Sequence, residues 1–234
     1  MTGFFEKALL PDNEAEFFIT SAEIDGAVKP FLPEKLAEGI RHHADLTICH
    51  LGGKRFVTAL GTGEYYKERI KNADIKEGVT EVKSPYPLDA AYCAAVFGKF
   101  AVANEKITDP YLLSVLKEEF TFINVSQGYA KCNICPIREN AVITEDEGIY
   151  KKLSDYMDVL LIGKGDISLP PYEYGFFGGS TGMIGKDKLF VNGNIKTHRD
   201  ADKIYAFLEK YSVKAIEREG KISDVGSVIA IVQA

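Results

Sequence analysis

The chain has 234 residues, of which 46% are hydrophobic and 26% are charged, with a formal net charge of -6 and an isoelectric point near 5.4. This acidic balance argues against a nucleic-acid-binding protein, which usually carries a basic patch. The longest apolar runs, such as 159–162 and 228–232, are too short to cross a bilayer. No linker-like stretch divides the chain, so we expect one globular domain over residues 1–234.

The N-terminus and the cysteines indicate the compartment. Residues 1–18 carry acidic side chains where a signal peptide has a basic start and an apolar stretch. The chain has four cysteines, a number that fits reduced thiols: Cys49, Cys93, Cys132 and Cys135. We therefore expect a cytoplasmic protein.

The predicted elements begin with an apolar strand within residues 15–24 and a helix over residues 33–43. The sequence then repeats a unit of two strands, a helix and a third strand. Short apolar runs bounded by Gly, Asn, Lys or Glu predict the second strand of each unit: 56–59, 100–103, 141–144 and 189–192. Similar runs predict strands that end a unit: 120–125, 159–162 and 213–217.

Helices are predicted between these two kinds of strand. The clearest covers 111–119, with Asp109 as its N-cap and Pro110 at the first helical position. Another covers 146–156, opened by Thr144 or Glu145. Apolar spacing predicts a further helix over 198–211, and the pattern is weakest for a helix over 64–72 in the first unit.

The unit recurs about every 44 residues, which indicates a repeat architecture. We expect each unit to begin with a strand that carries an equivalent anchor position, occupied in turn by Cys49, Cys93, Cys132, Thr181 and Val228. After Val228 the chain ends without a second strand, and residues 15–24 resemble the missing part. The fifth unit is therefore predicted to combine both ends of the chain and to close a ring, which removes exposed strand edges. The alternative is an open α/β sheet of βαβ units whose sequence similarity is accidental.

A ββαβ unit repeated five times about a pseudo-fivefold axis, with the ends sharing one unit, resembles the pentein superfamily. This α/β propeller includes arginine and agmatine deiminases, dimethylarginine hydrolases and amidinotransferases, and also a non-catalytic ribosome anti-association factor. The sequences HADLTICHLGG (43–53), GYAKCN (128–133) and GFFGGSTG (175–182) resemble a subfamily of uncharacterised bacterial penteins.

The resemblance implies a cysteine near the C-terminus that attacks a guanidinium carbon, two carboxylates that hold its nitrogens, and a histidine that moves protons. The C-terminal strand ISDVGSVIAIVQA contains no cysteine, and Val228 and Ile229 stand where the thiol is expected. Either the protein is a binding-only relative, or a cysteine of another unit serves. Cys132, at the pseudo-equivalent position, is the best candidate.

Three aspartates lie four residues before an anchor position: Asp45, Asp89 and Asp224. If they share a strand face with the anchors, they form part of an acidic ring that attracts a cation. The alternative is that each caps a neighbouring turn. His43 and His50 flank the first of these strands and are candidates for acid–base work, although His43 could equally end a helix, where a cation suits the dipole.

Cys132 and Cys135 form a CxxC motif. Structural zinc would need a second ligand pair, and no other CxxC or HxxxH is present. A redox CxxC usually opens a helix, whereas Pro136 follows here and the pattern is that of a strand. Buried apolar roles are favoured for Cys93 and Cys135.

The glycine-rich stretch 175–185 lacks the ending of a phosphate-binding loop, and its glycines fit close backbone packing at the axis. Ser180 and Thr181 can offer hydroxyls to a ligand. Asn133 is also a candidate for substrate binding. Residues 170–174 form a predicted loop over the channel mouth.

Taken together, the sequence predicts a deiminase-like or amidinotransferase-like enzyme. Catalysis is assigned to Cys132, His50, His43 and Asp45, and substrate binding to Asp89, Asn133, Ser180, Thr181 and Asp224. We expect a small-molecule ligand in the central channel. No cofactor, metal, nucleic acid or membrane partner is expected, and a homodimer is possible. The alternative is a non-catalytic pentein that binds a small molecule or a protein.

Overall fold

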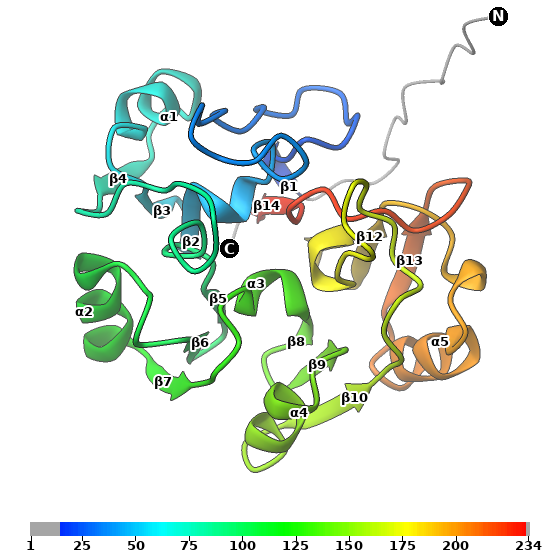
Figure 1. Ribbon diagram of the computed structural model, residues 1–234. Coiled ribbons are helices and arrows are strands. Elements are labelled where there is room, and N and C mark those ends of the chain that lie inside the picture. The colour runs from blue at the N-terminus through cyan, green and yellow to red at the C-terminus, as the bar shows by residue number, and fades with distance from the viewer. Residues whose placement is uncertain (1–14, 233–234) are drawn as a thin grey trace, which may run out of the picture.

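The computed structural model describes residues 15–232, whose strands form five small sheets arranged around one axis (Figure 1). The first two sheets are formed by β2 (Ile48–Gly52), β3 (Arg55–Thr58) and β4 (Asp74–Glu77), and by β5 (Ala95–Phe97), β6 (Phe100–Ala103) and β7 (Thr121–Asn124). The next two are formed by β8 (Ile134–Arg138), β9 (Ala141–Thr144) and β10 (Asp158–Leu161), and by β11 (Thr181–Gly185), β12 (Lys188–Val191) and β13 (Lys214–Glu217).

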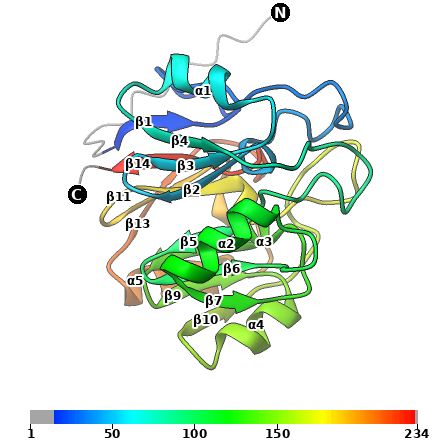
Figure 2. The same cartoon turned by 90° about the vertical axis from the view of Figure 1, so that its left-hand side faces the viewer.

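Each of these four sheets has the same topology. Its first two strands are an antiparallel hairpin, and its third strand is parallel to the second. A parallel pair needs a crossover connection, which a helix provides in each unit: α1 (Gly63–Arg69), α2 (Pro110–Glu119), α4 (Glu147–Leu153) and α5 (Ala201–Lys210). The four helices lie at the periphery of the ring (Figure 1), and the side view shows α2 on the outside of its sheet (Figure 2).

The fifth sheet joins the two ends of the described chain. β1 (Ala15–Ile19) pairs antiparallel with β14 (Ile229–Val232), so that Phe18 lies opposite Ala230. An isolated parallel bridge from Ile19 to Val28 stands where the other sheets have a third strand. This pairing confirms the predicted ring and excludes the open sheet.

The inner strands make the centre of the ring. β2 contacts β5, β5 contacts β8, β8 contacts β11, and β11 contacts β14. Gly182 in β11 is required by this packing, because a Cβ there would overlap the carbonyl oxygen of Val228. The main hydrophobic clusters fill the space between neighbouring sheets and their helices.

Most predicted helices are present with shifted ends. Asp109 caps α2 as expected, since its carboxylate accepts a hydrogen bond from the amide of Leu112. The cap of α4 is Asp146, not Thr144 or Glu145, and its carboxylate accepts from the amide of Ile149. α5 begins at Ala201, after a turn that contains His198.

The predicted helix over 33–43 is wrong. These residues form successive turns, with hydrogen bonds such as Leu36 N to Pro33 O and His43 N to Ile40 O. Gly39 weakens the helix, and a Cβ at this position would collide with Pro171 and Tyr172. The segment is therefore shaped by the loop that packs on it.

The predicted strand position of Cys132 is also wrong. Cys132 lies on the short helix α3 (Ala130–Asn133), and Cys93 lies in a turn before β5, whereas Cys49 is inside β2. Short 3-10 helices likewise precede two other inner strands, η1 (Ala44–Leu46) before β2 and η2 (Gly178–Ser180) before β11. The alternation argument that placed the aspartates and anchors on one strand face therefore does not apply.

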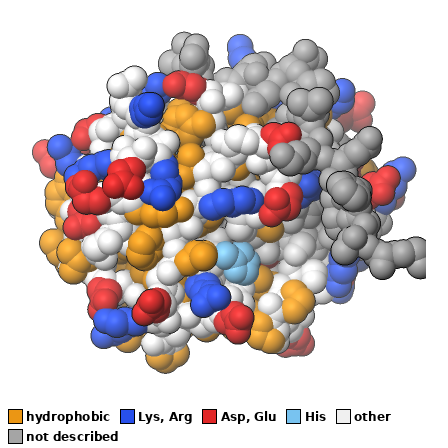
Figure 3. All heavy atoms as spheres, turned by 90° about the horizontal axis from the view of Figure 1, so that it is seen from above, with side chains coloured by type: hydrophobic (Ala, Val, Ile, Leu, Met, Phe, Trp, Pro, Cys, Tyr) orange, Lys and Arg blue, Asp and Glu red, His pale blue; other side chains and the backbone are white. Residues whose placement is uncertain are grey.

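Two expectations concern the compartment. The absence of a signal peptide was inferred largely from residues 1–14, which lie outside the described residues. Between residues 15 and 232 no helix has the length and apolarity needed to cross a membrane. On the face seen in Figure 3, acidic and basic side chains are interspersed, with hydrophobic side chains among them.

Candidate functional site

A cavity of about 250 Å³ lies where the inner strands β2, β8 and β14 begin. Its wall combines aromatic rings with a few polar groups. The aromatic residues are Tyr129, Tyr172, Tyr174 and Phe176, and the polar residues include His43, Cys132, Glu173 and Asp224. The predicted loop 170–174 therefore forms part of this wall.

Three candidate residues meet beside the cavity: His43 and Cys132 line it, and Asp45 contacts Cys132. One ligand-type atom from each of His43, Asp45 and Cys132 lies within 4.8 Å of the others. The thiol of Cys132 donates a hydrogen bond of 2.9 Å to Oδ2 of Asp45. All three residues are buried, so these polar groups interact with little screening by water.

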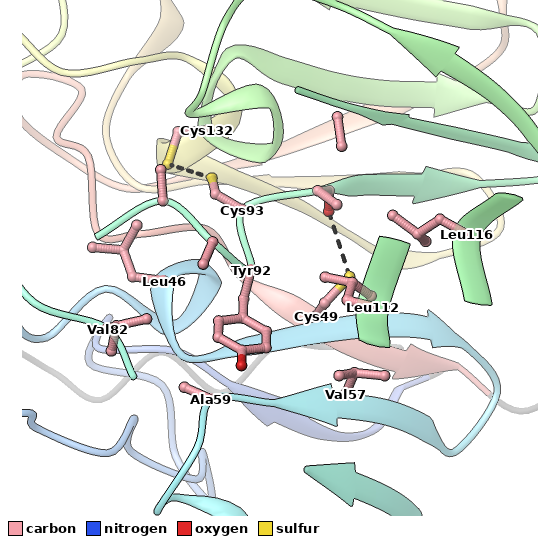
Figure 4. Packing of buried hydrophobic residues seen from close by; sticks show 14 of the residues in the cluster. Leu46, Cys49, Val57, Ala59, Val82, Tyr92, Cys93, Leu112, Leu116 and Cys132 are labelled. Carbon is pink, nitrogen blue, oxygen red and sulfur yellow. Dashed lines mark hydrogen bonds between the residues drawn. The ribbon is translucent and has the colours of Figure 1, made fainter. Parts of the chain in front are cut away.

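The Cys132 thiol is protonated in this environment. Its pKa is raised well above the ordinary value, first by its contact with Cys93 and then by burial and the Asp45 carboxylate. The two sulfur atoms are 3.7 Å apart and point toward one another (Figure 4). Without an additional positive charge, Cys132 is a weak nucleophile.

The imidazole of His43 is neutral at physiological pH. Burial lowers its pKa to about 4, although Asp45 opposes this shift. Nε2 of His43 has no hydrogen-bond partner among the described residues and lies 3.9 Å from Oδ1 of Asp224. Gly226, at φ 67°, allows this approach, because a Cβ there would overlap His43.

Asp224 also lines the cavity, next to His43. Burial raises its pKa to about 6, although its oxygens accept hydrogen bonds of 2.9 Å from the amides of Phe176 and Gly226. Gly175 and Gly179 pack so closely on this carboxylate that a Cβ at either position would overlap Asp224. The glycine-rich stretch therefore shapes the pocket around Asp224.

Other predicted residues do not line this cavity. Asp89 lies behind it, where its carboxylate accepts a 3.0 Å hydrogen bond from the hydroxyl of Tyr129 and burial raises its pKa. Asn133 is buried and donates to the carbonyl of Tyr129, while Ser180 donates to the carbonyl of Phe177. Asp89 and Asn133 thus support Tyr129 from outside the cavity.

The remaining two, His50 and Thr181, line a second cavity of about 250 Å³ that is bounded by the inner strands. Lys131 also lines this cavity, although its neighbour Cys132 lines the first. His50 is held by a 2.8 Å contact of Nε2 with the carbonyl of Gly53. The structure therefore separates His50 and Thr181 from the group formed by His43, Asp45 and Cys132.

A chain of hydrogen bonds connects the two cavities. Lys131 Nζ donates to Ser227 Oγ at 3.1 Å, and Ser227 Oγ donates to Oδ2 of Asp45 at 2.7 Å. Asp45 also accepts from Cys132, so one carboxylate oxygen holds both the serine and the thiol. Lys131 thereby places a positive charge within reach of the buried Asp45.

Sequence reasoning did not select Ser227, Lys131 or Glu145. Ser227 has a φ of 70°, a conformation that is uncommon without glycine and that marks functional sites more often than chance. Residues 224–227 read Asp-Val-Gly-Ser, and nothing in this local sequence indicates the unusual backbone of Ser227. Glu145 accepts from the amide of Phe177, and burial raises its pKa to about 7.

Comparisons with known proteins found a matching family model and several similar solved structures. A family model, described as a family of unknown function (DUF6873), matches residues 24–229. A DDAH from Pseudomonas aeruginosa, in a cysteine-to-serine variant complexed with citrulline, has a TM-score of 0.51 at 8% identity, and the match covers 80% of this chain and 71% of that one. The chain has the pentein fold.

Two further structures resemble the chain more weakly. The C. jejuni agmatine deiminase gives a TM-score of 0.48 at 12% identity, covering 77% of this chain and 67% of that one. SxtG, an amidinotransferase of the saxitoxin biosynthetic pathway from Microseira wollei, gives 0.47 at 12% identity, covering 74% of this chain. The match spans only 61% of SxtG. No curated protein matches the chain at a significant level.

Proposed function

Because this chain belongs to DUF6873, a family of unknown function, and has the pentein fold, we propose that it is a deiminase-like or amidinotransferase-like enzyme whose nucleophile is Cys132. Its substrate is a small guanidino-type or other cationic molecule. The observation that carries this proposal is the meeting of Cys132, Asp45 and His43 beside a cavity that Asp224 also lines.

The cavity suits a planar cation. The carboxylate of Asp224 can accept the N–H groups of a guanidinium, and aromatic rings such as Tyr129 and Phe176 favour a cation over their faces. A bound cation stabilises the ionised form of Asp224, which burial otherwise disfavours. It also favours the thiolate of Cys132, so that the substrate itself activates the nucleophile.

The proposed reaction proceeds in two steps. Sγ of Cys132 bonds to the guanidinium carbon while the thiol proton passes to Asp45, and the departing nitrogen takes that proton and leaves as an amine. Water then bonds to the same carbon, the C–S bond breaks, and the sulfur regains a proton. The net reaction consumes one water and yields a ureido product and an amine.

Labelling with 2-chloroacetamidine, a cationic amidine that alkylates thiolates, tests the assignment. We expect one adduct, on Cys132, with slower labelling in the presence of agmatine or arginine. The control is the Cys135→Ala variant, which removes a buried thiol outside the cavity and should label like the wild type. The proposal fails if folded protein leaves Cys132 unmodified and converts no arginine, agmatine or dimethylarginine.

A second candidate function is binding without catalysis. It is favoured by the strongly raised pKa of Cys132 and by the absence of cysteine from the C-terminal segment 222–234. Calorimetry distinguishes the two: a binding-only protein gives saturable binding of a guanidino compound that is unchanged in Cys132→Ser, without product by mass spectrometry. Loss of binding in Asp224→Asn is expected for both candidates.

A further inference from the structure

Two buried polar atoms beside Cys132 have no hydrogen-bond partner within residues 15–232. They are Nε2 of His43 and Oδ1 of Asp45, in residues that are 2% and 1% exposed. A buried polar atom without a partner costs about 1–3 kcal/mol, so native structures rarely keep one without a reason. Two such atoms next to a thiol indicate a bound metal ion, to which all three side chains can donate an electron pair.

We propose that His43, Asp45 and Cys132 bind a zinc-like divalent ion, with one coordination position open toward the cavity. Imidazole, carboxylate and thiolate are the donor groups that zinc takes in proteins, and three protein ligands with one open position are typical of reactive zinc sites. A site with a thiolate excludes magnesium and calcium, which prefer oxygen ligands alone.

The geometry requires only a small closure. The three ligand atoms lie within 4.8 Å of one another, whereas the bond lengths of a tetrahedral zinc site place its ligand atoms about 3.3–3.8 Å apart. A shift of about 1 Å, shared among three side chains, suffices. The 3-10 helix η1 carries Asp45 and the helix α3 carries Cys132, so both ligands are attached to defined elements.

The charges also balance. A divalent ion with one thiolate, one carboxylate and one neutral imidazole gives a net charge of zero, which removes the penalty of burying the carboxylate unpaired. Binding forms the sulfur–metal bond and releases the thiol proton to solvent. No oxidant or reductant is needed.

The hydrogen bonds around Asp45 provide the outer support of such a site. Ser227 donates to Oδ2 of Asp45 and is itself held by Lys131, which leaves Oδ1 without a partner and available as a ligand. Outer partners of this kind orient a ligand, and their loss typically weakens metal binding by about 10–100-fold. The chain therefore contains both the ligands and their support.

Titration of the full-length, reduced, chelator-treated protein with Co²⁺ tests the site, because a cobalt–thiolate bond gives a charge-transfer absorption band. We expect saturation at one Co²⁺ per chain and loss of the band when Zn²⁺ is added. Cys132→Ser should lose the band. Ser227→Ala should keep it with about 10-fold weaker binding.

Cys135→Ala is the matched control and should keep the band, because Cys135 lies on β8 outside this cluster. A wild-type protein without the band at saturating Co²⁺, or a band that survives in Cys132→Ser, overturns the proposal. If Cys132→Ser does not fold by circular dichroism, Asp45→Asn replaces it, and unchanged cobalt affinity in that variant is equally decisive against the site.

This inference goes beyond the proposed function, and the two can fail separately. Cobalt binding is measured without substrate, whereas amidine labelling is measured without metal. Because the ion and a covalent substrate use the same sulfur, Zn²⁺ at saturation is expected to block labelling of Cys132 if both proposals hold. Labelling that is unaffected by bound Zn²⁺ would contradict Cys132 as a ligand.

Discussion

At the scale of single residues, burial at the centre of the molecule shifts the pKa values of titratable groups in the direction that favours their uncharged forms. His43 is neutral, the Cys132 thiol is protonated, and the pKa of Glu145 is raised to about 7 by burial. A carboxyl group whose pKa is higher in the folded than in the unfolded protein favours folding at low pH and loses that contribution as the pH rises.

Glu145 should therefore make stability depend on pH. Its ordinary pKa is 4.5, so its contribution is complete below pH 4.5 and is lost as the pH rises to about 7. We expect Glu145→Gln to gain up to about 3 kcal/mol of unfolding free energy relative to wild type between pH 4.5 and pH 8. Urea unfolding of both proteins at the two pH values measures this difference, and the contribution of His43, which both proteins share, cancels in the comparison. Parallel pH profiles would contradict the assignment.

At the scale of elements, the turns that precede helices and inner strands connect neighbouring units. Asp109 shows this for α2. One carboxylate oxygen accepts from Leu112 N, as an ordinary N-cap does, while the other accepts from the amides of Val79 and Thr80 at 2.9 and 2.7 Å and from the Tyr92 hydroxyl at 3.1 Å. This side chain therefore joins α2 to the loop that follows β4.

Asp109→Ala should consequently be more destabilising than loss of an ordinary cap. We expect a decrease of about 3 kcal/mol or more, because several buried donors lose their acceptor together. Asp146→Ala is the control, since within residues 15–232 Asp146 accepts from Ile149 N and the Gln127 side chain alone, and about 1 kcal/mol is expected. Chemical denaturation measures both, and equal losses would show that the contacts across units contribute little.

At the scale of the whole molecule, ring closure depends on a short pair of strands. Ile231 in β14 is 2% exposed and packs in the cluster with Ile19 and Phe56, so it joins both ends of the chain to the first sheet. Ala230, its neighbour on the same strand, is only half-buried.

We expect Ile231→Ala to cost about 2–5 kcal/mol, the range for removing a buried isoleucine, and Ala230→Ser to cost less than about 1 kcal/mol. Thermal unfolding should remain a single transition in both variants, because the first and fifth sheets share one cluster. A separate early transition in Ile231→Ala would mean that the closing sheet unfolds independently of the ring.

The ring itself could be predicted because the sequence features that indicate it recur at a regular spacing. Apolar runs and capping residues such as Asp109 mark each unit, and residues 15–24 resemble a missing strand. The segments just before the inner strands could not be predicted in the same way. Short helical turns such as α3 have no periodicity, and residues 33–43 have a helical pattern that packing against Pro171 overrides.

The candidate site shows the same limit. Asp45 and Cys132 were selected as neighbours on equivalent strand faces, but the structure brings them together through η1 and α3. Ser227 was missed because its role depends on a φ of 70° and on contacts with residues far away in the chain, Lys131 and Asp45. Such contacts carry no local sequence pattern.

The polar layer formed by Lys131, Ser227, Asp45 and Cys132 affects how a ligand can enter and leave the molecule. Lys131 lines one cavity and Cys132 lines the other, so this layer of hydrogen-bonded side chains stands between the two. Tyr172, in the wall of the candidate cavity, is 42% exposed, so this side of the wall reaches solvent. We expect a ligand to enter and leave on this side, so that movement of the loop over residues 170–174 would limit the rate of its release.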